Sequence, residues 1–516
     1  MECWSDGPKN LSMTPLFHYS ITPISLASTL GPPWINVNRS AVATLRDTLY
    51  NQRMLGRGPH LILALLIAGC SYLPLPSKTP EAHAIQEDEE TKISRQFRRE
   101  ARKQLSLTNN PEIEGYVDQV GRRLLSAMGP QPFEYRFFVV GDSQLNAFSV
   151  PGGSIYVYSG LLERARGTGE IAGVLGHEII HAKDHHMARL SSGLDPISIV
   201  GMLAMILARG GAAAQAAGAV SQALAATRQF SYSRQLELEA DTLGTRYMAQ
   251  AGYDPRGVLS FMKTLDQERA ISQTDIPAYL MTHPMTQDRI ANVELIIRSL
   301  NAERPRSDGP DPLKRVQVML RLERHDEAAV LGEYEKLSGQ NAGNAEARHF
   351  IALAQQSQGK LAEARANYEK ARTLDPSLPG IDRDLGRLYG QIGEFQFAHE
   401  AFNRAVRAQP QEAVNYLFLG ELFERENNLR EAVQAYLNAS NLSPLSPVVF
   451  NRLGLAYGRM NRPGDGYYYL ARSFLLQDDD AMAMANFERA IKILGPASPR
   501  GQMIKEELER LKARGR

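Results

Sequence analysis

The chain has little cysteine, and the cysteine it has is not arranged for a structural role. Cys3 and Cys70 are the two cysteines among 516 residues, too few for a disulfide framework or a four-cysteine zinc site. They also lie too far apart in the sequence for a CxxC redox pair. We therefore expect packing to stabilise the fold, and any bound metal to be held by other residue types.

The net charge is close to zero, and long hydrophobic runs are few. The formal net charge of +1 leaves no strongly basic domain of the kind that nucleic-acid-binding proteins show, so we expect no nucleic-acid partner. The charge-free run 196–208 is shorter than the ~18 residues that suggest a membrane span. Hydrophobic residues, at 43%, nevertheless suffice for folded cores, and the length predicts two to four domains.

The start of the chain has the features of a processed leader. Residues 54–70 combine a short basic lead, an apolar stretch and the ending Ile-Ala-Gly-Cys, which resembles a bacterial lipoprotein signal. We expect cleavage before Cys70, lipid attachment at that cysteine and a polar tether over 71–90. Because such signals begin a chain, residues 1–53 are interpreted as a mis-assigned extension, with translation starting at Met54. A buried apolar helix is the alternative for 54–70.

Local patterns predict a mixed domain over 91–300. Asn110 before Pro111 is typical of a helix start, and apolar residues then recur at helical spacing as far as Leu124. Runs rich in β-branched and aromatic residues predict a small sheet with strands at 135–140, 146–149 and 154–158. We expect the last of these to be an edge strand that can pair with an extended peptide.

The C-terminal third repeats itself at steps of 34 residues. Apolar and aromatic positions both follow this step, as in Leu385, Leu419 and Leu453, and in Tyr368, Phe402 and Tyr436. The period resembles that of tetratricopeptide (TPR) repeats, which are pairs of antiparallel helices. After a linker at 301–312 we therefore expect an α-solenoid over 313–516. The expected fold class is mainly α: an α+β domain with a small sheet, followed by the solenoid.

His177 and His181 form an HExxH motif together with Glu178. The motif falls in a helix expected from about 169 to 190, where positions i and i+4 share one face, so both imidazoles can reach one zinc ion. Glu178 can then act as a general base on a water at that metal. The alternative is two histidines on an amphipathic helix beside a structural glutamate.

A catalytic zinc site needs a third protein ligand and an open position. Glu237 and Asp241 share a helix face, so Glu237 could ligate the metal while Asp241 orients a ligating histidine. An ordinary charged helix is the alternative. His185 and His186 lie a further turn along the first helix, and we expect them to be exposed or to lie behind the ligands.

HExxH followed by ExxxD resembles the gluzincin metallopeptidases related to the CAAX prenyl proteases and the heat-shock membrane proteases. The segment from Asn146 to Gly160 and the segment Thr282-His283-Pro284 ahead of Arg289 also resemble this family. The resemblance covers roughly residues 95–300, and it implies an α+β peptidase domain in that part of the chain.

The resemblance also implies roles for individual residues. It makes His177, His181 and Glu237 the ligands of one Zn²⁺ per chain. It makes Glu178 the catalytic base, with Asp241 supporting a ligand from behind. His283 matches a position from which a histidine can approach the zinc and hold such an enzyme latent. A structural histidine at a helix start is the alternative for His283.

The expected function is that of a zinc-dependent endopeptidase in a Gram-negative envelope, periplasmic and anchored by lipid to the outer membrane. Its substrates would be unfolded or misassembled outer-membrane proteins, and its TPR repeats would bind the client or the assembly machinery. The alternative is a chaperone or adaptor with a latent peptidase domain. We interpret the run 196–208, with the Ala/Gly-rich stretch to residue 227, as a helical flap over the site or a membrane-touching surface. A buried core helix is the other interpretation.

Overall fold

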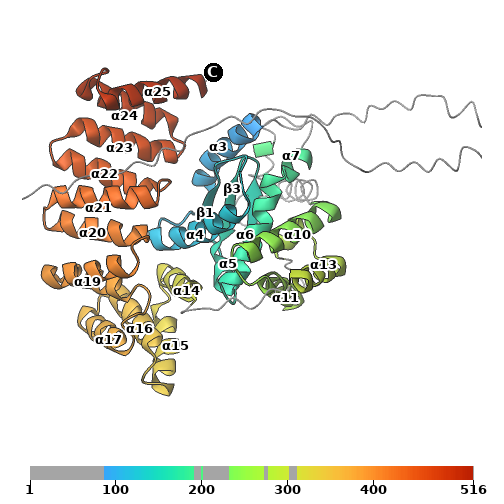
Figure 1. Cartoon of the computed structure of the whole chain (residues 1–516). Helices are drawn as coiled ribbons and strands as arrows, with labels where there is room; N and C mark the ends of the chain where they lie inside the picture. The colour runs from blue at the N-terminus through green and yellow to red at the C-terminus, as the bar shows by residue number, and fades with distance from the viewer. Residues whose placement is uncertain (1–86, 191–198, 201–231, 272–276, 301–310, 515–516) are drawn as a thin grey trace, which may run out of the picture. The chain divides into compact units, whose positions relative to one another are not determined.

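The fold is described from a computed structural model (Figure 1). The described residues are 87–190, 199–200, 232–271, 277–300 and 311–514. All of them belong to one compact unit, Thr79–Arg516. The predicted leader with Cys70, and nearly all of the run from 196 to 227, lie outside the described residues. The described elements are almost all helices beside one small sheet, so the predicted fold class is confirmed. None of the described helices is long and apolar enough to cross a membrane.

The first described helix, α3 (Glu87–Gln104), begins inside the predicted tether. Residues 87–90 form its first turn. Glu90 in this turn is fully buried, and its carboxylate lies 2.6 Å from Nδ1 of His185. The next helix, α4 (Pro111–Ala127), starts where the sequence predicts. The Asn110 side chain accepts hydrogen bonds from the N–H groups of Glu112 and Ile113, at 3.0 and 3.4 Å, as an N-cap does.

The sheet has three strands, β1 (Arg136–Val140), β2 (Ala147–Val150) and β3 (Ser154–Tyr158), in the order β1-β3-β2. β3 runs parallel to β1 and antiparallel to β2. The prediction that 154–158 is an edge strand is therefore wrong. All five of its residues are buried, because a run of β-branched and aromatic residues is apolar on both faces and needs cover on both sides. The edges of the sheet are β1 and β2.

The helix predicted from 169 to 190 is two helices, α6 (Thr168–Lys183) and α7 (His186–Leu190). His185 breaks it with a φ of 56°, a left-handed conformation that ends the regular turn. A short helix, α5 (Ser159–Arg164), links β3 to α6. The domain continues with α10 (Arg234–Gln250), α11 (Arg256–Ile271), α12 (Ala278–Thr282) and α13 (Gln287–Leu300).

Helices α6 and α10 pack closely through two glycines. A Cβ atom placed on Gly244 of α10 would lie 3.0 Å from the carbonyl carbon of Gly176 and 3.1 Å from the backbone nitrogen of His177. The reciprocal Cβ on Gly176 would lie 3.3 Å from the carbonyl oxygen of Gly244. The glycines therefore let the two backbones approach, and this approach brings the acidic residues of α10 to the histidines of α6.

Antiparallel helix pairs make up the C-terminal part of the chain (Figure 1). They are α15 (Glu327–Gln340), α16 (Ala345–Ser357), α17 (Leu361–Leu374), α18 (Ile381–Ile392), α19 (Phe395–Ala408), α20 (Ala413–Arg425), α21 (Leu429–Leu442), α22 (Pro447–Arg459), α23 (Pro463–Leu476), α24 (Asp480–Leu494) and α25 (Pro499–Arg514). The aromatic positions of the repeat, Tyr368, Phe402 and Tyr436, are buried between helices.

Helix α14 (Pro312–Glu323) joins the two halves of the chain. Its residues Leu313 and Val316 belong to the core of the α+β part, whereas Val318 packs into the core of the repeats. Asp311 caps α14 at the N–H of Leu313 (2.9 Å) and also accepts from the N–H of Thr168 at the start of α6 (2.8 Å). One carboxylate thus ties the first repeat-side helix to the helix that carries HExxH.

Candidate metal centre

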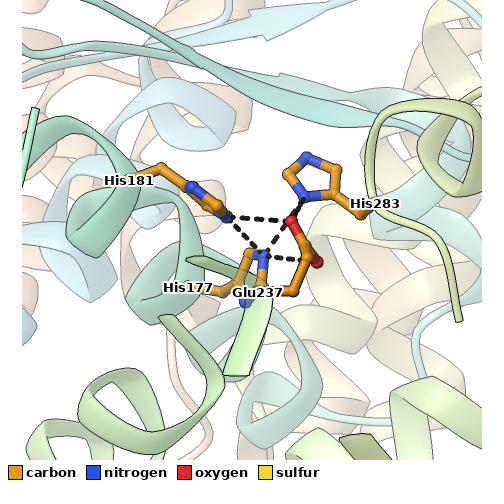
Figure 2. A group of neighbouring side chains, drawn as sticks. All are labelled: His177, His181, Glu237 and His283. Atoms are coloured by element: carbon orange, nitrogen blue, oxygen red, sulfur yellow. Dashed lines mark hydrogen bonds and ion pairs between the residues drawn. The ribbon is translucent and has the colours of Figure 1, made fainter. Parts of the chain in front are cut away.

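Three helices bring the candidate site residues together (Figure 2). His177, Glu178 and His181 lie on α6, Glu237 lies on α10, and His283 follows the last turn of α12. All of them are buried. Figure 2 shows the rings of the three histidines and the Glu237 carboxylate directed toward one point.

The ligand atoms of this group lie within contact of one another. Nε2 of His177 is 2.9 Å from Nε2 of His181 and 3.2 Å from Nδ1 of His283. Oε1 of Glu237 is 3.3 Å from Nε2 of His181 and 2.9 Å from Nδ1 of His283. Ligands about 2.0–2.1 Å from a tetrahedral zinc ion lie about 3.3 Å apart. The spacing and the nitrogen and oxygen donors therefore fit zinc.

The contacts of the Nδ1 atoms of the two α6 histidines are also those expected of metal-ligating imidazoles. Nδ1 of His177 lies 3.0 Å from the carboxylate of Asp241, and Nδ1 of His181 lies 2.9 Å from Nδ1 of His186. If each ligating ring donates its Nδ1–H to this partner, its Nε2 carries a lone pair. Two such lone pairs face each other at 2.9 Å, an arrangement that a cation between them stabilises.

Negative charge in the pocket favours a positive ion at this point. Burial by itself would lower the pKa of His177, but its hydrogen bond to Asp241 and the charge of Glu237 raise it. Burial also opposes ionisation of Glu237, yet the neighbouring histidines hold its pKa well below the ordinary value. Glu237 is thus a carboxylate under ordinary conditions, as a metal ligand must be.

Arg289, from α13, holds the acidic side of the site in place. Its Nε and Nη2 donate to the two oxygens of Asp241 at 2.7 and 2.8 Å, and its Nη1 lies 2.5 Å from Glu237. Burial would raise the pKa of Asp241, but the bonds and charge of Arg289 keep it low. In the sequence, the only indication of this role is the place of Arg289 in a family-like segment, five residues after Pro284.

His186 is the second residue whose role the sequence did not specify. It is fully buried, although it follows the break at His185, and burial lowers its pKa to about 3, so its ring is neutral. If His181 donates its Nδ1–H to Nδ1 of His186, the proton of His186 is on Nε2, 3.4 Å from Glu239. Asp184, His186 and Glu239 also lie together, but this tautomer leaves no imidazole lone pair for a second cation.

Glu178 lies beside the cluster and contacts His283. Its Oε1 is 3.3 Å from Nε2 of His283, while Nδ1 of the same ring faces Glu237. Burial raises the pKa of Glu178, and the nearby His283 and His177 partly oppose this. Tyr279 stacks on His283 with ring centroids 4.5 Å apart, which fixes the ring in this position.

An HExxH helix whose histidines meet a glutamate from a second helix is the donor set of a metallopeptidase. Residues 111–297 match the sequence model of Peptidase family M48, and residues 345–378 match that of a tetratricopeptide repeat. The chain thus carries a domain that matches the M48 peptidases, followed by TPR repeats, and the predicted resemblance to that superfamily is confirmed.

Similar curated proteins are peptidases. The chain is 31% identical over 210 residues to the beta-barrel assembly-enhancing protease of Escherichia coli K12, covering 40% of this chain and 43% of that protein. It is 30% identical over 211 residues to a putative beta-barrel assembly-enhancing protease of Vibrio cholerae, with the same coverage. It is 28% identical over 194 residues to the mitochondrial metalloendopeptidase OMA1 of Schizosaccharomyces pombe, covering 37% of this chain and 56% of that protein. The chain therefore spans about half the length of these relatives, or less.

Proposed function

We propose that this protein is a zinc-dependent endopeptidase with His177, His181 and Glu237 as its metal ligands. The observation that carries the proposal is the convergence of three histidines and one glutamate at distances of 2.9–3.3 Å in a buried pocket. The M48 match over the same residues and the endopeptidase names of the relatives support it.

Each side chain around the cluster has its own role in the proposed reaction. A zinc ion in this site supplies Lewis acidity, which polarises a carbonyl and lowers the pKa of a water molecule. Glu178 takes the proton of the attacking water and returns it to the leaving amine. Asp241, held by Arg289, orients His177, and His186 orients His181.

The substrate would be an extended polypeptide held at β2. Among the residues that the structure describes, β2 pairs on one edge only, with β3, and the strand also contacts α6. An extended chain added to this edge would lie alongside the HExxH helix. Unfolded or misassembled proteins can offer such a segment, whereas a packed native protein cannot.

His283 gives the site a latent state in this proposal. Its Nδ1 stands with the other ligand atoms, and its Nε2 lies 3.3 Å from Glu178. One imidazole can therefore fill the fourth metal position and occupy the general base at the same time. Activation would require this ring to move away.

The setting of this activity is the envelope of a Gram-negative bacterium. We propose a periplasmic protein, anchored to the outer membrane through lipid on Cys70, that degrades outer-membrane proteins. Its TPR repeats would bind the client or the assembly machinery. The names of the bacterial relatives support this setting. An adaptor or chaperone with a latent peptidase is the second candidate, because His283 can close the metal site.

The test compares the parent protein with Glu178→Gln and with Glu294→Gln, a control on the exposed side of α13. We expect Glu178→Gln to keep one zinc per chain, measured by metal analysis, and to lose roughly 10²–10⁴-fold in casein cleavage. The control should retain both properties. Undiminished cleavage by zinc-loaded Glu178→Gln would contradict the proposal, and absence of cleavage by every form, with client binding intact, would favour the adaptor.

A further inference from the structure

The polar contacts of the His283 ring come from the candidate metal centre. Its Nδ1 lies 2.9 Å from Glu237 and 3.2 Å from Nε2 of His177, and its Nε2 lies 3.3 Å from Glu178. Figure 2 shows this ring facing the Glu237 carboxylate. Each of these partners has a role of its own in the proposed reaction. Contacts of His283 outside this set can therefore hold the ring in place without taking part in the chemistry.

Two tyrosine rings supply such contacts. Tyr279 of α12 stacks on His283 with ring centroids 4.5 Å apart and 23° between the planes. Tyr232, which directly precedes the cap of α10, lies beside the same ring with centroids 5.2 Å apart and 32° between the planes. Both tyrosines are buried. We call Tyr232 and Tyr279 the aromatic clamp of His283.

Tyr232 also connects the His283 segment to a candidate ligand on α6. Its ring stacks on His181 with centroids 3.8 Å apart and 25° between the planes. Its backbone N–H donates to the carbonyl of Thr282 at 3.1 Å, one residue before His283. The position of His283 and the orientation of His181 are thus linked through one side chain.

The rest of the molecule fixes both rings of the clamp. Phe261 of α11 meets Tyr279 edge-on at 5.7 Å, and the two belong to one hydrophobic cluster. Tyr232 belongs to a second cluster, which includes Tyr156 of β3. The N–H of His283 donates to the carbonyl of Tyr279 at 2.9 Å. Because each tyrosine is packed into a core of its own, moving the His283 ring away from the metal position breaks its stacking contacts.

Contacts of this kind are strong enough to control a switch. An aromatic pair shifts an equilibrium by about 2–10-fold beyond the effect of its buried area. The rate at saturating metal follows the fraction of molecules in which the site is open. Weakening one contact of the clamp therefore changes activity by a measurable factor, while the metal ligands and the general base stay in place.

We propose that Tyr279 and Tyr232 are positioning residues that hold His283 in the latent position and so set the open fraction of the enzyme. The proposal rests on the proposed function and specifies how its latent state is maintained. Neither tyrosine needs to contact the substrate in this role.

The first experiment follows Co²⁺ bound to the full chain by its visible absorption, which changes when a histidine ligand is replaced by water. His283→Ala defines the spectrum of the open site. Tyr279→Leu keeps an apolar side chain but removes the ring, and we expect its spectrum to move from that of the parent toward that of His283→Ala. Tyr279→Phe keeps the ring and should restore most of the parent spectrum.

Tyr457→Leu is the matched control for the loss of a stacked tyrosine. Tyr457 stacks on Tyr469 with centroids 5.3 Å apart, but it lies in α22 of the repeats. We expect its Co²⁺ spectrum and its rate of casein cleavage to equal those of the parent.

The second experiment measures casein cleavage at saturating zinc. Tyr279→Leu should raise the rate about 2–10-fold, because the open fraction increases. The same change in the His283→Ala protein should give no further rise, because the ring that the clamp holds is absent. A tyrosine that only supports the fold would lower the rate in both proteins.

Thermal melting shows whether each variant is folded, and Tyr279→Met takes the place of Tyr279→Leu if that variant does not fold. A folded variant with the spectrum and rate of the parent overturns the proposal. An equal rise in rate in the presence and absence of His283 also overturns it, as does a Tyr279→Phe protein as active as Tyr279→Leu. A parent that binds no Co²⁺ and cleaves no casein contradicts the proposed function, and with it the latent state.

Discussion

At the scale of the residue, His181 shows how a candidate ligand depends on its neighbours. Its Nε2 points into the candidate metal centre, while its Nδ1 contacts His186 and its face is covered by Tyr232 with centroids 3.8 Å apart. The direction of the ring and the place of its proton are thus set by residues that do not reach the metal position. The same holds for His177, which depends on Asp241 and, through it, on Arg289.

Replacing His186 by alanine should weaken zinc binding about 10–100-fold, because His181 loses the acceptor that fixes its tautomer. Competition with a chromophoric chelator measures this affinity without reference to activity. His399→Ala is the control, since His399 lies in α19 of the repeats and contacts Glu426 and no candidate ligand. Zinc affinity equal to that of the parent would mean that His186 is only a packing residue.

Replacing His283 by alanine should raise casein cleavage several-fold, because the fourth metal position and Glu178 both become free. The rate is measured at saturating zinc, and the melting temperature is recorded beside it. A lower melting temperature with no gain in rate would identify His283 as structural, which is the alternative noted from the sequence.

At the scale of the element, the close contact of α6 and α10 positions the donors of both helices. The contact depends on glycine at 176 and 244, because a side chain at either position meets the backbone of the other helix. The break at His185 is a second such feature. It ends α6 after the HExxH turn and lets α7 return His186 to the site.

Gly244→Ala should destabilise the protein by about 1–3 kcal/mol, because its Cβ must push α10 away from α6. It should also weaken zinc binding, since Glu237 moves with the helix. Gly332→Ala on α15 is the matched control: nothing lies within 4 Å of the added Cβ, so a gain of about 0.5–1 kcal/mol is expected. Chemical denaturation measures both variants. A Gly244→Ala variant with the same free energy of unfolding as the parent would contradict this role of the glycine contact.

At the scale of the whole molecule, charges buried between the M48 domain and the repeats link folding to pH in opposite ways. The pKa of Glu112 is lowered because Arg315 and Arg383 outweigh its burial. A carboxyl with a lowered pKa adds stability above its unfolded pKa, and this stability is lost as the pH falls. Glu114 is the opposite case. Burial raises its pKa to about 7, so the folded state binds a proton more tightly than the unfolded state does.

Glu114 should therefore reduce the stability of the protein as the pH rises from about 4.5 to 7. Glu114→Gln should remove this slope. The variant should match the parent near pH 4 and exceed it at pH 8, by on the order of 2–3 kcal/mol. Urea midpoints across this pH range measure the effect, with exposed Glu431→Gln as the control. Parallel curves for the parent and Glu114→Gln would show that this carboxyl titrates normally.

The sequence by itself determined the features that depend on neighbours along the chain. The spacing of His177 and His181 places both imidazoles on one helix face, and the 34-residue step of the repeats follows from one helix pair per unit. The prediction that Asn110 caps a helix is confirmed, because its side chain accepts a hydrogen bond from the backbone N–H of Glu112. These features depend on residues close together in the sequence, so the spacing of residue types is enough to predict them.

The tertiary structure decided which distant residues meet. The position of β3 in the middle of the sheet depends on pairing with strands on both sides, which no feature of 154–158 alone can specify. The burial of His186 beside His181 and the hydrogen bonds from Arg289 to Asp241 arise from long-range packing. Side chains far apart in sequence become neighbours there because two helices approach at glycines and buried ion clusters lock the repeats in place.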